Sequence, residues 1–510
     1  MGRDIVIGSG PSGVAAAAAL LGRGRDVLML DVGHRMEQRS EELRRRLGDQ
    51  EPDQWAPTDR DAATTYRRSE KRDTMSPFGS DFLFRAPDQA ENWQESSIVH
   101  ALRPSFAKGG LSNGWGASML PYRQADMDGW PITADDLGPH YSAAARIANI
   151  AARRDALANL FSAHAIETER PLPMSRQAHS LHDRLNRQRP ALDRLGLSFG
   201  ASRQAVADGC RLCAMCLYGC PYGLIFQAGD VVDRLVADHA LDYRSGVYVT
   251  HFEENATGVR VHSAEDVFEG DRLFIAAGVL PTALLMLKSL GADAPELVLK
   301  DSQHFYLPML HRWGAGDPAR EPRHTLAQLF WEIVNPDVDA HSVHVQLYSH
   351  NDTYAADMRG RFGALAGVMK PAIEWMSRRL IVAQAFLHSD VSPAIGVTLH
   401  RDALAFRAIA NPMTSAVVQR AARTLARAAR IGGMLPLTPL LRKGTLGSSF
   451  HCGGSLPMRA SPSIGETDIL GTPRGMRRVH IVDASVFPSV PASTITFAVM
   501  ANAHRIATNA

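Results

Sequence analysis

Three glycines and an acid near the start of the chain have the types and spacing that bind a dinucleotide. Gly8, Gly10 and Gly13 fit the pattern G-x-G-x-x-G, and Asp31 lies 18 residues after the third glycine. In such a loop the glycines allow a tight turn, a close approach of the backbone to a pyrophosphate, and close helix–strand packing. The acid can hold ribose hydroxyls, and the N-terminus of the following helix favours the negative phosphates. The motif predicts dinucleotide binding but does not by itself separate FAD from NAD.

Four of the five cysteines fall within eleven residues, and Pro221 follows them. Their spacing, C-x2-C-x2-C-x3-C-P, is the iron–sulfur run of bacterial ferredoxins, so it predicts a 4Fe-4S or 3Fe-4S cluster. Two other interpretations stay open. The thiols could be small buried side chains on one face of a helix, or they could hold zinc, which more often uses two separated C-x2-C pairs. The candidate ligands are Cys210, Cys213, Cys216 and Cys220.

The bulk composition excludes several classes of function. The 510 residues carry 55 basic and 53 acidic side chains, so there is no electrostatic case for binding nucleic acid. No apolar run is long enough for a transmembrane segment. The first residues lack the features of a secretory signal, so we expect a cytoplasmic enzyme. Export of the folded enzyme to the periplasm with a signal-bearing partner stays open.

The elements that must position these residues can be read from apolar patterns. Residues 4–31 predict a strand, a glycine loop, a helix and a second strand, as in a βαβ unit with a buried parallel sheet. Residues 271–291 repeat strand, turn and helix. Residues 300–412 alternate as antiparallel strands do, and the chain closes with a strand, an irregular turn and a helix. The fold class is therefore α/β with an additional antiparallel sheet.

Several ordered segments resemble the glucose–methanol–choline (GMC) family of FAD-dependent oxidoreductases. They are 5–33 (IVIGSGPSG…), 109–144 (GGLSNGWGAS…), 273–291 (LFIAAGVLP…), 450–458 (FHCGGSLPM) and 479–507 (VHIVDASVFP…). The resemblance implies a Rossmann-like FAD-binding domain with an interleaved α+β substrate domain built on an antiparallel sheet. The FAD-binding domain would comprise 1–125, with a charged excursion at 34–105, then 206–292 with the cysteine loop 210–220, and finally 446–510. The substrate domain would comprise 126–205 and 293–445.

The resemblance also implies which residues perform the chemistry. His451 corresponds to the active-site histidine that faces the flavin N5 and the substrate carbinol, and the pKa of histidine suits removal of a hydroxyl proton. The family's second position, usually asparagine or histidine, is Thr494, which cannot act as a base. His451 would then work with Thr494 or Ser493 alone, or a side chain from the substrate sheet would take the second role; the candidates there are His344, His350 and His388.

The expected contacts with FAD follow the same segments. They are Gly8, Gly10, Pro11, Ser12, Gly13, Asp31, Gly109, Gly110, Asn113, Gly114, Ala277, Asp483, Ala484 and Thr496.

The function implied is an FAD-dependent dehydrogenase that oxidises an alcohol, such as a sugar or glycoside hydroxyl, by hydride transfer to flavin. A subset of the family carries an iron–sulfur cluster at the cysteine loop and passes electrons to a cytochrome, whereas other members with a similar loop hold no iron. A cytochrome, a quinone or another acceptor is therefore a candidate partner. Two alternatives stay open: an oxidase that uses dioxygen and has structural cysteines, and a flavin-bound lyase or isomerase without net redox turnover.

Overall fold

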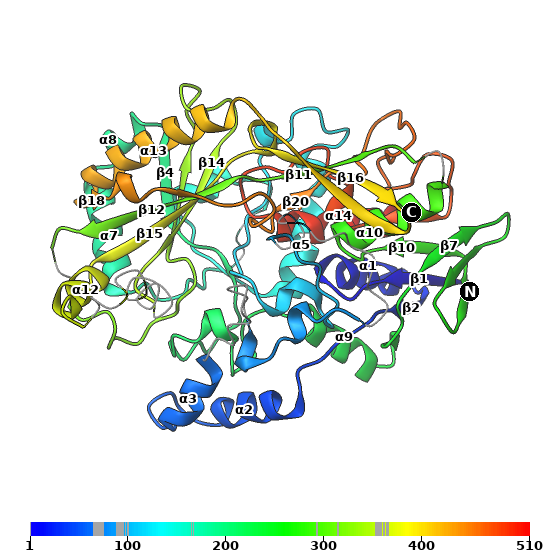
Figure 1. Ribbon diagram of the computed structural model, residues 1–510, viewed down its shortest axis with the longest axis horizontal. Helices are drawn as coiled ribbons and strands as arrows, with labels where there is room; N and C mark the ends of the chain where they lie inside the picture. Colours follow the sequence, from blue (N-terminus) through cyan, green and yellow to red (C-terminus); the bar gives the residue numbers. More distant parts are fainter. Residues whose placement is uncertain are drawn as a thin grey trace.

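The computed structural model describes most of the chain in two lobes (Figure 1). The described residues are 2–64, 76–87, 96, 98, 101–164, 166, 168–291, 294–313, 316–351, 360, 363 and 367–510. Part of the charged excursion expected at 34–105 therefore lies outside them. Its described part includes helices α2 (Gln38–Gly48) and α3 (Pro57–Thr64). Among the helices that the structure describes, none combines the length and the apolar character needed to cross a membrane.

One lobe is built on a five-stranded parallel sheet with the order β21-β10-β1-β2-β6. The predicted βαβ unit is confirmed, with α1 (Pro11–Gly22) between the first two strands in the sequence. Helix α1 packs against the C-terminal helix α14 (Ile495–Asn509), and α14 also packs against α5 (Ala134–Ala148). The strands are β1 (Arg3–Ile7), β2 (Asp26–Leu30), β6 (Asp242–Arg244), β10 (Arg272–Ile275) and β21 (Val479–Ile481).

Two further helices and a small sheet complete this lobe. Helices α9 (Ala228–Ala237) and α10 (Val279–Leu290) precede β6 and follow β10 in the sequence, and a three-stranded antiparallel sheet lies at its periphery. Its strands are β7 (His251–Glu254), β8 (Val259–His262) and β9 (Val267–Gly270). Both chain termini lie in this lobe (Figure 1).

The other lobe contains an antiparallel sheet with the order β18-β12-β15-β14-β13-β4, and β19 also pairs with β12. Alternate residues of its strands face opposite sides, so one face is apolar and the other polar. The apolar face packs under α13 (Thr414–Ile431) and α7 (Arg176–Arg187) in a separate hydrophobic core. The strands are β4 (Leu197–Ala201), β12 (His304–His311), β13 (Leu329–Ile333), β14 (Val343–Tyr348), β15 (Leu380–Phe386), β18 (Met434–Pro436) and β19 (Arg442–Lys443).

A four-stranded antiparallel sheet, β17-β16-β11-β20, differs from the expectation for residues 300–412. From the sequence we expected residues 394–409 to join the same antiparallel sheet as the other strands of 300–412. Instead β16 (Ala394–His400) and β17 (Ala403–Ile409) pair with β11 (Leu297–Asp301), which also pairs with β20 (Cys452–Gly453). The reason is packing, because the apolar side chains of β11 and β16 join the core of the parallel-sheet lobe. Alternation alone does not say which sheet a strand joins.

Short elements connect these sheets. The helices are α6 (Ala156–Leu160), α8 (Arg189–Asp193) and α12 (Lys370–Ser377), and the strands are β3 (Ile150–Ala151) and β5 (Gln204–Ala205). The domain boundaries given above stay predictions.

Candidate functional site

A cavity of about 740 Å³ lies at the ends of the parallel strands. The loop between β1 and α1 forms one wall, as expected where ligands bind at the carboxyl ends of such strands. Gly8 has φ +97°, and a Cβ there would meet the carbonyl oxygen of Ala276 at 2.5 Å. A Cβ on Gly13 would meet the carbonyl oxygen of Gly8 at 2.0 Å, whereas one on Gly10 would meet no atom within 4 Å. Gly8 and Gly13 thus allow the backbone of the turn to pack closely where a side chain would clash. Gly10 faces open space beside the cavity.

Asp31 directly follows β2 and lines this cavity. Its carboxylate accepts hydrogen bonds from the hydroxyl of Ser9 and, at 3.2 Å, from that of Tyr243. Burial raises the pKa of Asp31 to about 6, although these hydrogen bonds oppose the shift. Burial disfavours the charged form of this carboxyl group. A ribose hydroxyl that reached Asp31 would donate a further hydrogen bond and so favour the charged form.

The second glycine-rich segment forms the adjacent wall. A 3₁₀ helix spans Gly110–Asn113, and the residue before it, Gly109, has φ +87°. The side chain of Asn113 donates to the carbonyl oxygens of Lys108 and Gly110 at 2.9 and 2.8 Å, so it holds its own loop. Of the predicted FAD contacts, three do not line the cavity. They are Gly13, Gly109 and Asn113, whereas Gly8, Gly10, Pro11, Ser12, Asp31, Gly110, Gly114, Ala277, Asp483, Ala484 and Thr496 line it.

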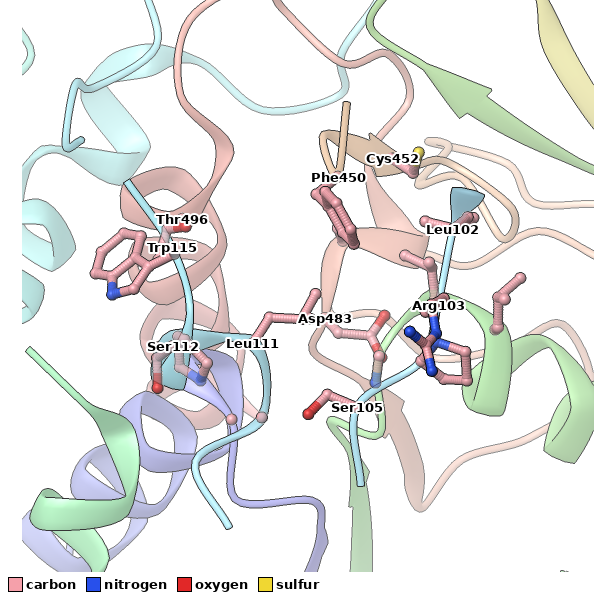
Figure 2. A pocket seen from close by; sticks show the side chains of 18 of the residues that line it. Leu102, Arg103, Ser105, Leu111, Ser112, Trp115, Phe450, Cys452, Asp483 and Thr496 are labelled. Carbon is pink, nitrogen blue, oxygen red and sulfur yellow. The ribbon is translucent and has the colours of Figure 1, made fainter. Parts of the chain in front are cut away.

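Asp483 is fixed at the centre of the cavity wall by the residues around it. It follows β21, and its carboxylate accepts from the backbone N–H of Gly278 at 2.9 Å and from the hydroxyl of Thr282 at 2.5 Å. Burial raises the pKa of Asp483 against these hydrogen bonds. Figure 2 shows Asp483 between Ser112 and Trp115 on one side and Arg103 on the other.

His451 reaches the same cavity from the loop before β20. Its ring stacks on Phe386 of β15 with 4.7 Å between ring centroids, and its Nδ1 is buried without a hydrogen-bond partner. Burial, and then the neighbouring imidazoles of His344 and His304, lower the pKa of His451 to about 3. The ring is therefore neutral at pH 7, although the burial that keeps it neutral also weakens it as a base.

Thr494 lines the cavity beside His451 but already has a structural partner. Its hydroxyl oxygen accepts a hydrogen bond from the backbone N–H of Leu120 at 2.9 Å. The hydroxyl hydrogen remains available for donation, so Thr494 can orient an oxygen atom but cannot take up a proton. Ser493 is buried, and its hydroxyl has no hydrogen-bond partner.

The structure shows a polar wall that the sequence did not predict. The polar face of the antiparallel sheet lines the cavity opposite the glycine loops, and the hydroxyl of Tyr348 donates to Gln346 at 2.6 Å. Polar and apolar residues alternate along each of these strands, which indicates one polar face. The sequence does not reveal that this face meets the cavity. These lining residues are Tyr306, Gln346, Tyr348, Gln384 and Phe386.

The four loop cysteines are brought together around one small cavity that His324 also lines. They are not on one helical face, because Leu212, Ala214 and Gly219 have positive φ angles and the loop turns repeatedly. Burial raises the pKa of Cys213 to about 12 and that of Cys216 to about 11, and neighbouring thiols add to both shifts.

The thiols do not lie as close as a single metal ion would require. Within the described part of the chain, three metal-ligand atoms lie within 4.8 Å of one another at His251, Glu253 and His262 and at His341, His388 and Asp390, but not among the cysteines. Tetrahedral zinc with bonds of about 2.3 Å would hold its sulfurs about 4 Å apart. A cluster places several irons between its thiolates and holds them further apart. Cys452 lies elsewhere, where its Sγ contacts the carboxylate of Asp301 at 3.3 Å.

The fold and the cavity define a two-lobed α/β protein with a dinucleotide-type loop facing a polar antiparallel sheet. The family model described as "GMC oxidoreductase" matches residues 401–503, which include His451 and Thr494. Residues 401–503 thus match the GMC oxidoreductases, in agreement with the resemblance seen in the sequence.

A solved structure of similar fold is pyridoxine 4-oxidase from Mesorbium loti, with a TM-score of 0.59 and 14% identity over 99% of this chain and 98% of that one. At this identity the likeness shows the fold alone. No curated protein matches the chain.

Proposed function

We propose that this chain is an FAD-dependent enzyme that oxidises an alcohol, such as a sugar or glycoside hydroxyl, with His451 as the base. The observation that carries the proposal is that the dinucleotide-type loop and His451 line one continuous cavity. The open space beside Gly10, where a Cβ would meet nothing within 4 Å, fits a backbone that approaches a pyrophosphate. When bound, FAD supplies a hydride acceptor for the alcohol carbon.

The residues of the chain would perform the remaining tasks. His451 takes the hydroxyl proton while neutral, and Thr494 orients the oxygen through its free hydroxyl hydrogen. Tyr348 and Gln346 face the same space and can hold further hydroxyl groups, which suits a polyhydroxylated substrate.

The experiment is anaerobic addition of a panel of alcohols and sugars to the purified protein while the flavin absorbance is followed. Bleaching by one substrate class supports the proposal, and loss of bleaching in His451→Ala with retained flavin assigns the base. Turnover without bleaching would instead favour a lyase or isomerase. Rapid peroxide formation on admission of air would favour an oxidase over a dehydrogenase.

We further propose that the cysteine loop holds an iron–sulfur cluster on Cys210, Cys213, Cys216 and Cys220. The surroundings of these thiols fit a cluster, because backbone N–H groups donate hydrogen bonds to the sulfurs. The N–H of Thr325 donates to Cys216 and that of Leu224 donates to Cys220, each at 3.4 Å. Such donors stabilise thiolate charge. Leu217, within the loop, lines the large cavity, so the loop borders the proposed flavin site. If bound, the cluster would supply one-electron transfer toward a cytochrome or quinone acceptor.

The cluster is tested by iron and acid-labile sulfide per chain in protein purified anaerobically. Three or four irons in the wild type, lost in Cys213→Ser and kept in the control Cys452→Ser, would support it. Iron-free protein would leave the thiols structural, and zinc in its place would identify a different metal site.

A further inference from the structure

A buried carboxylate binds the segment of chain that carries His451. Asp301, the last residue of β11, is 1% exposed and is the register partner of Cys452 on β20. Its Oδ2 accepts a hydrogen bond from the backbone N–H of Gly447 at 2.8 Å, and its Oδ1 accepts one from the hydroxyl of Ser449. The thiol of Cys452 lies 3.3 Å from the same Oδ1. One carboxylate therefore bonds residues at the start, middle and end of the segment 447–452, the His451 loop.

Ser449 connects this carboxylate to His451 itself. The hydroxyl of Ser449 donates its hydrogen to Asp301, and its oxygen accepts a hydrogen bond from the backbone N–H of His451 at 3.0 Å. The carbonyl oxygen of His451 accepts from the backbone N–H of Ser302 at 3.1 Å. Both backbone polar groups of His451 are thus bound, and one of them is bound through Ser449 to Asp301.

The side chain of His451 has less support than its backbone. Its Nδ1 is buried without a hydrogen-bond partner, so no side chain orients the ring through that nitrogen. The ring stacks on Phe386 with 4.7 Å between centroids, and such ring pairs occur over a range of about 4.5–7 Å. The position of the imidazole therefore depends strongly on the backbone that carries it.

The backbone of the His451 loop has a conformation that needs support. Phe450, directly before His451, has φ +56°. A bulky residue in the left-handed region persists only where its surroundings hold it there. Phe450 is 41% exposed, so burial of its ring provides little of that hold. The hydrogen bond from the N–H of His451 to Ser449 spans Phe450 and closes the turn.

The role of Asp301 requires both of its oxygens to act as acceptors. Burial raises the pKa of Asp301, and hydrogen bonds from Ser449, Gly447 and Cys452 oppose the shift. These donors favour the carboxylate over the acid. An asparagine of the same shape has one acceptor oxygen, so its NH2 group would face either Gly447 or Ser449 and could not accept from it.

We propose that Asp301 and Ser449 are positioning residues that fix the backbone of His451 and thereby the place of its imidazole in the cavity. The inference rests on the proposed function. Neither side chain exchanges a proton with the substrate, because the Ser449 hydrogen stays bonded to Asp301. Proton transfer depends steeply on the distance between the base and the hydroxyl group. A displaced imidazole should therefore slow the chemical step and leave substrate binding nearly unchanged.

The test compares Asp301→Asn and Ser449→Ala with Ser449→Thr, which keeps the hydroxyl, and with the control Ser302→Ala. Ser302 is buried next to Asp301, but its hydroxyl bonds to the carbonyl oxygen of Leu387 at 2.7 Å rather than to the His451 loop. We expect Asp301→Asn and Ser449→Ala to lower the anaerobic flavin-reduction rate about 10- to 100-fold, with KM within about twofold. Ser449→Thr should recover most of the rate, and the control should keep the wild-type rate.

A second readout does not need turnover. In flavin-loaded protein labelled with ¹³C-histidine, the ring resonances of His451, identified by their loss in His451→Ala, are shifted by the stacked ring of Phe386. That shift should change in Asp301→Asn and Ser449→Ala but not in Ser302→Ala.

Unchanged rates or unchanged His451 resonances in both test variants would overturn the proposal, and so would an equal loss of rate in the control. If no alcohol reduces the wild-type flavin, the proposed function fails, and the resonances still decide whether Asp301 places this ring. Should Asp301→Asn fail to fold, Ser449→Ala alone decides.

Discussion

Replacing Gly10 by alanine separates cofactor binding from folding more cleanly than any other change in the glycine loop. Gly10 has φ −65° and ψ −179°, which alanine adopts freely, and its Cβ would meet no protein atom within 4 Å. The free energy of unfolding of the flavin-free protein should therefore change by less than about 0.5 kcal/mol. The methyl group would instead stand where the backbone approaches the pyrophosphate.

The expected loss of affinity can be worked from that position. Moving the phosphates away weakens one hydrogen bond to a charged group, which is worth about 1.5–3 kcal/mol. The Kd for FAD should thus rise about 10- to 100-fold. The matched control is Gly22→Ala at the other end of α1, where a Cβ also meets nothing within 4 Å and no cavity is near.

The assay is FAD titration of the deflavinated variants by fluorescence quenching, with thermal unfolding of the same samples. A Kd for Gly10→Ala equal to that of Gly22→Ala, at unchanged stability, would refute the reasoning that a pyrophosphate lies against this loop. A large drop in stability would show that the space beside Gly10 is filled in the folded protein.

Three further changes test other parts of the structure. Gly8→Ala, at φ +97° and 2.5 Å from a carbonyl oxygen, should destabilise the flavin-free protein by more than about 1 kcal/mol, measured by denaturant unfolding; an unchanged midpoint would contradict the strain argument. Thr494→Val should cost about 1–3 kcal/mol because it leaves the N–H of Leu120 unsatisfied, whereas Thr494→Ser should keep the wild-type Tm; equal Tm values would argue against this hydrogen bond. Asp4 is fully buried between Arg25 and Arg272; burial raises its pKa, but the two arginines outweigh this and hold it below 3.8. The stability it contributes is present above about pH 4 and lost as the pH falls through its folded pKa, so Asp4→Asn should flatten the acid limb of a Tm-against-pH curve and lower Tm at pH 7; a parallel curve would contradict the assignment.

The sequence by itself determined the elements whose signals are local. The glycine pattern, the apolar strands and the alanine-rich helix predicted β1, α1 and β2, because tight turns and buried parallel strands restrict residue types over short distances. A local signal also marks the start of α5, where Thr133 and Asp136 form a capping box. Resemblance in ordered motifs placed His451 and Asp483, and both line the cavity.

Only the tertiary structure decided which distant side chains meet. Strand alternation predicted antiparallel strands but not that β16 and β17 leave the large sheet for β11, since sheet choice depends on packing against α10 and the neighbouring core. Nor could alternation show that His344 faces Glu332 and flanks the ring beneath His451, because register sets those contacts between strands far apart in the sequence.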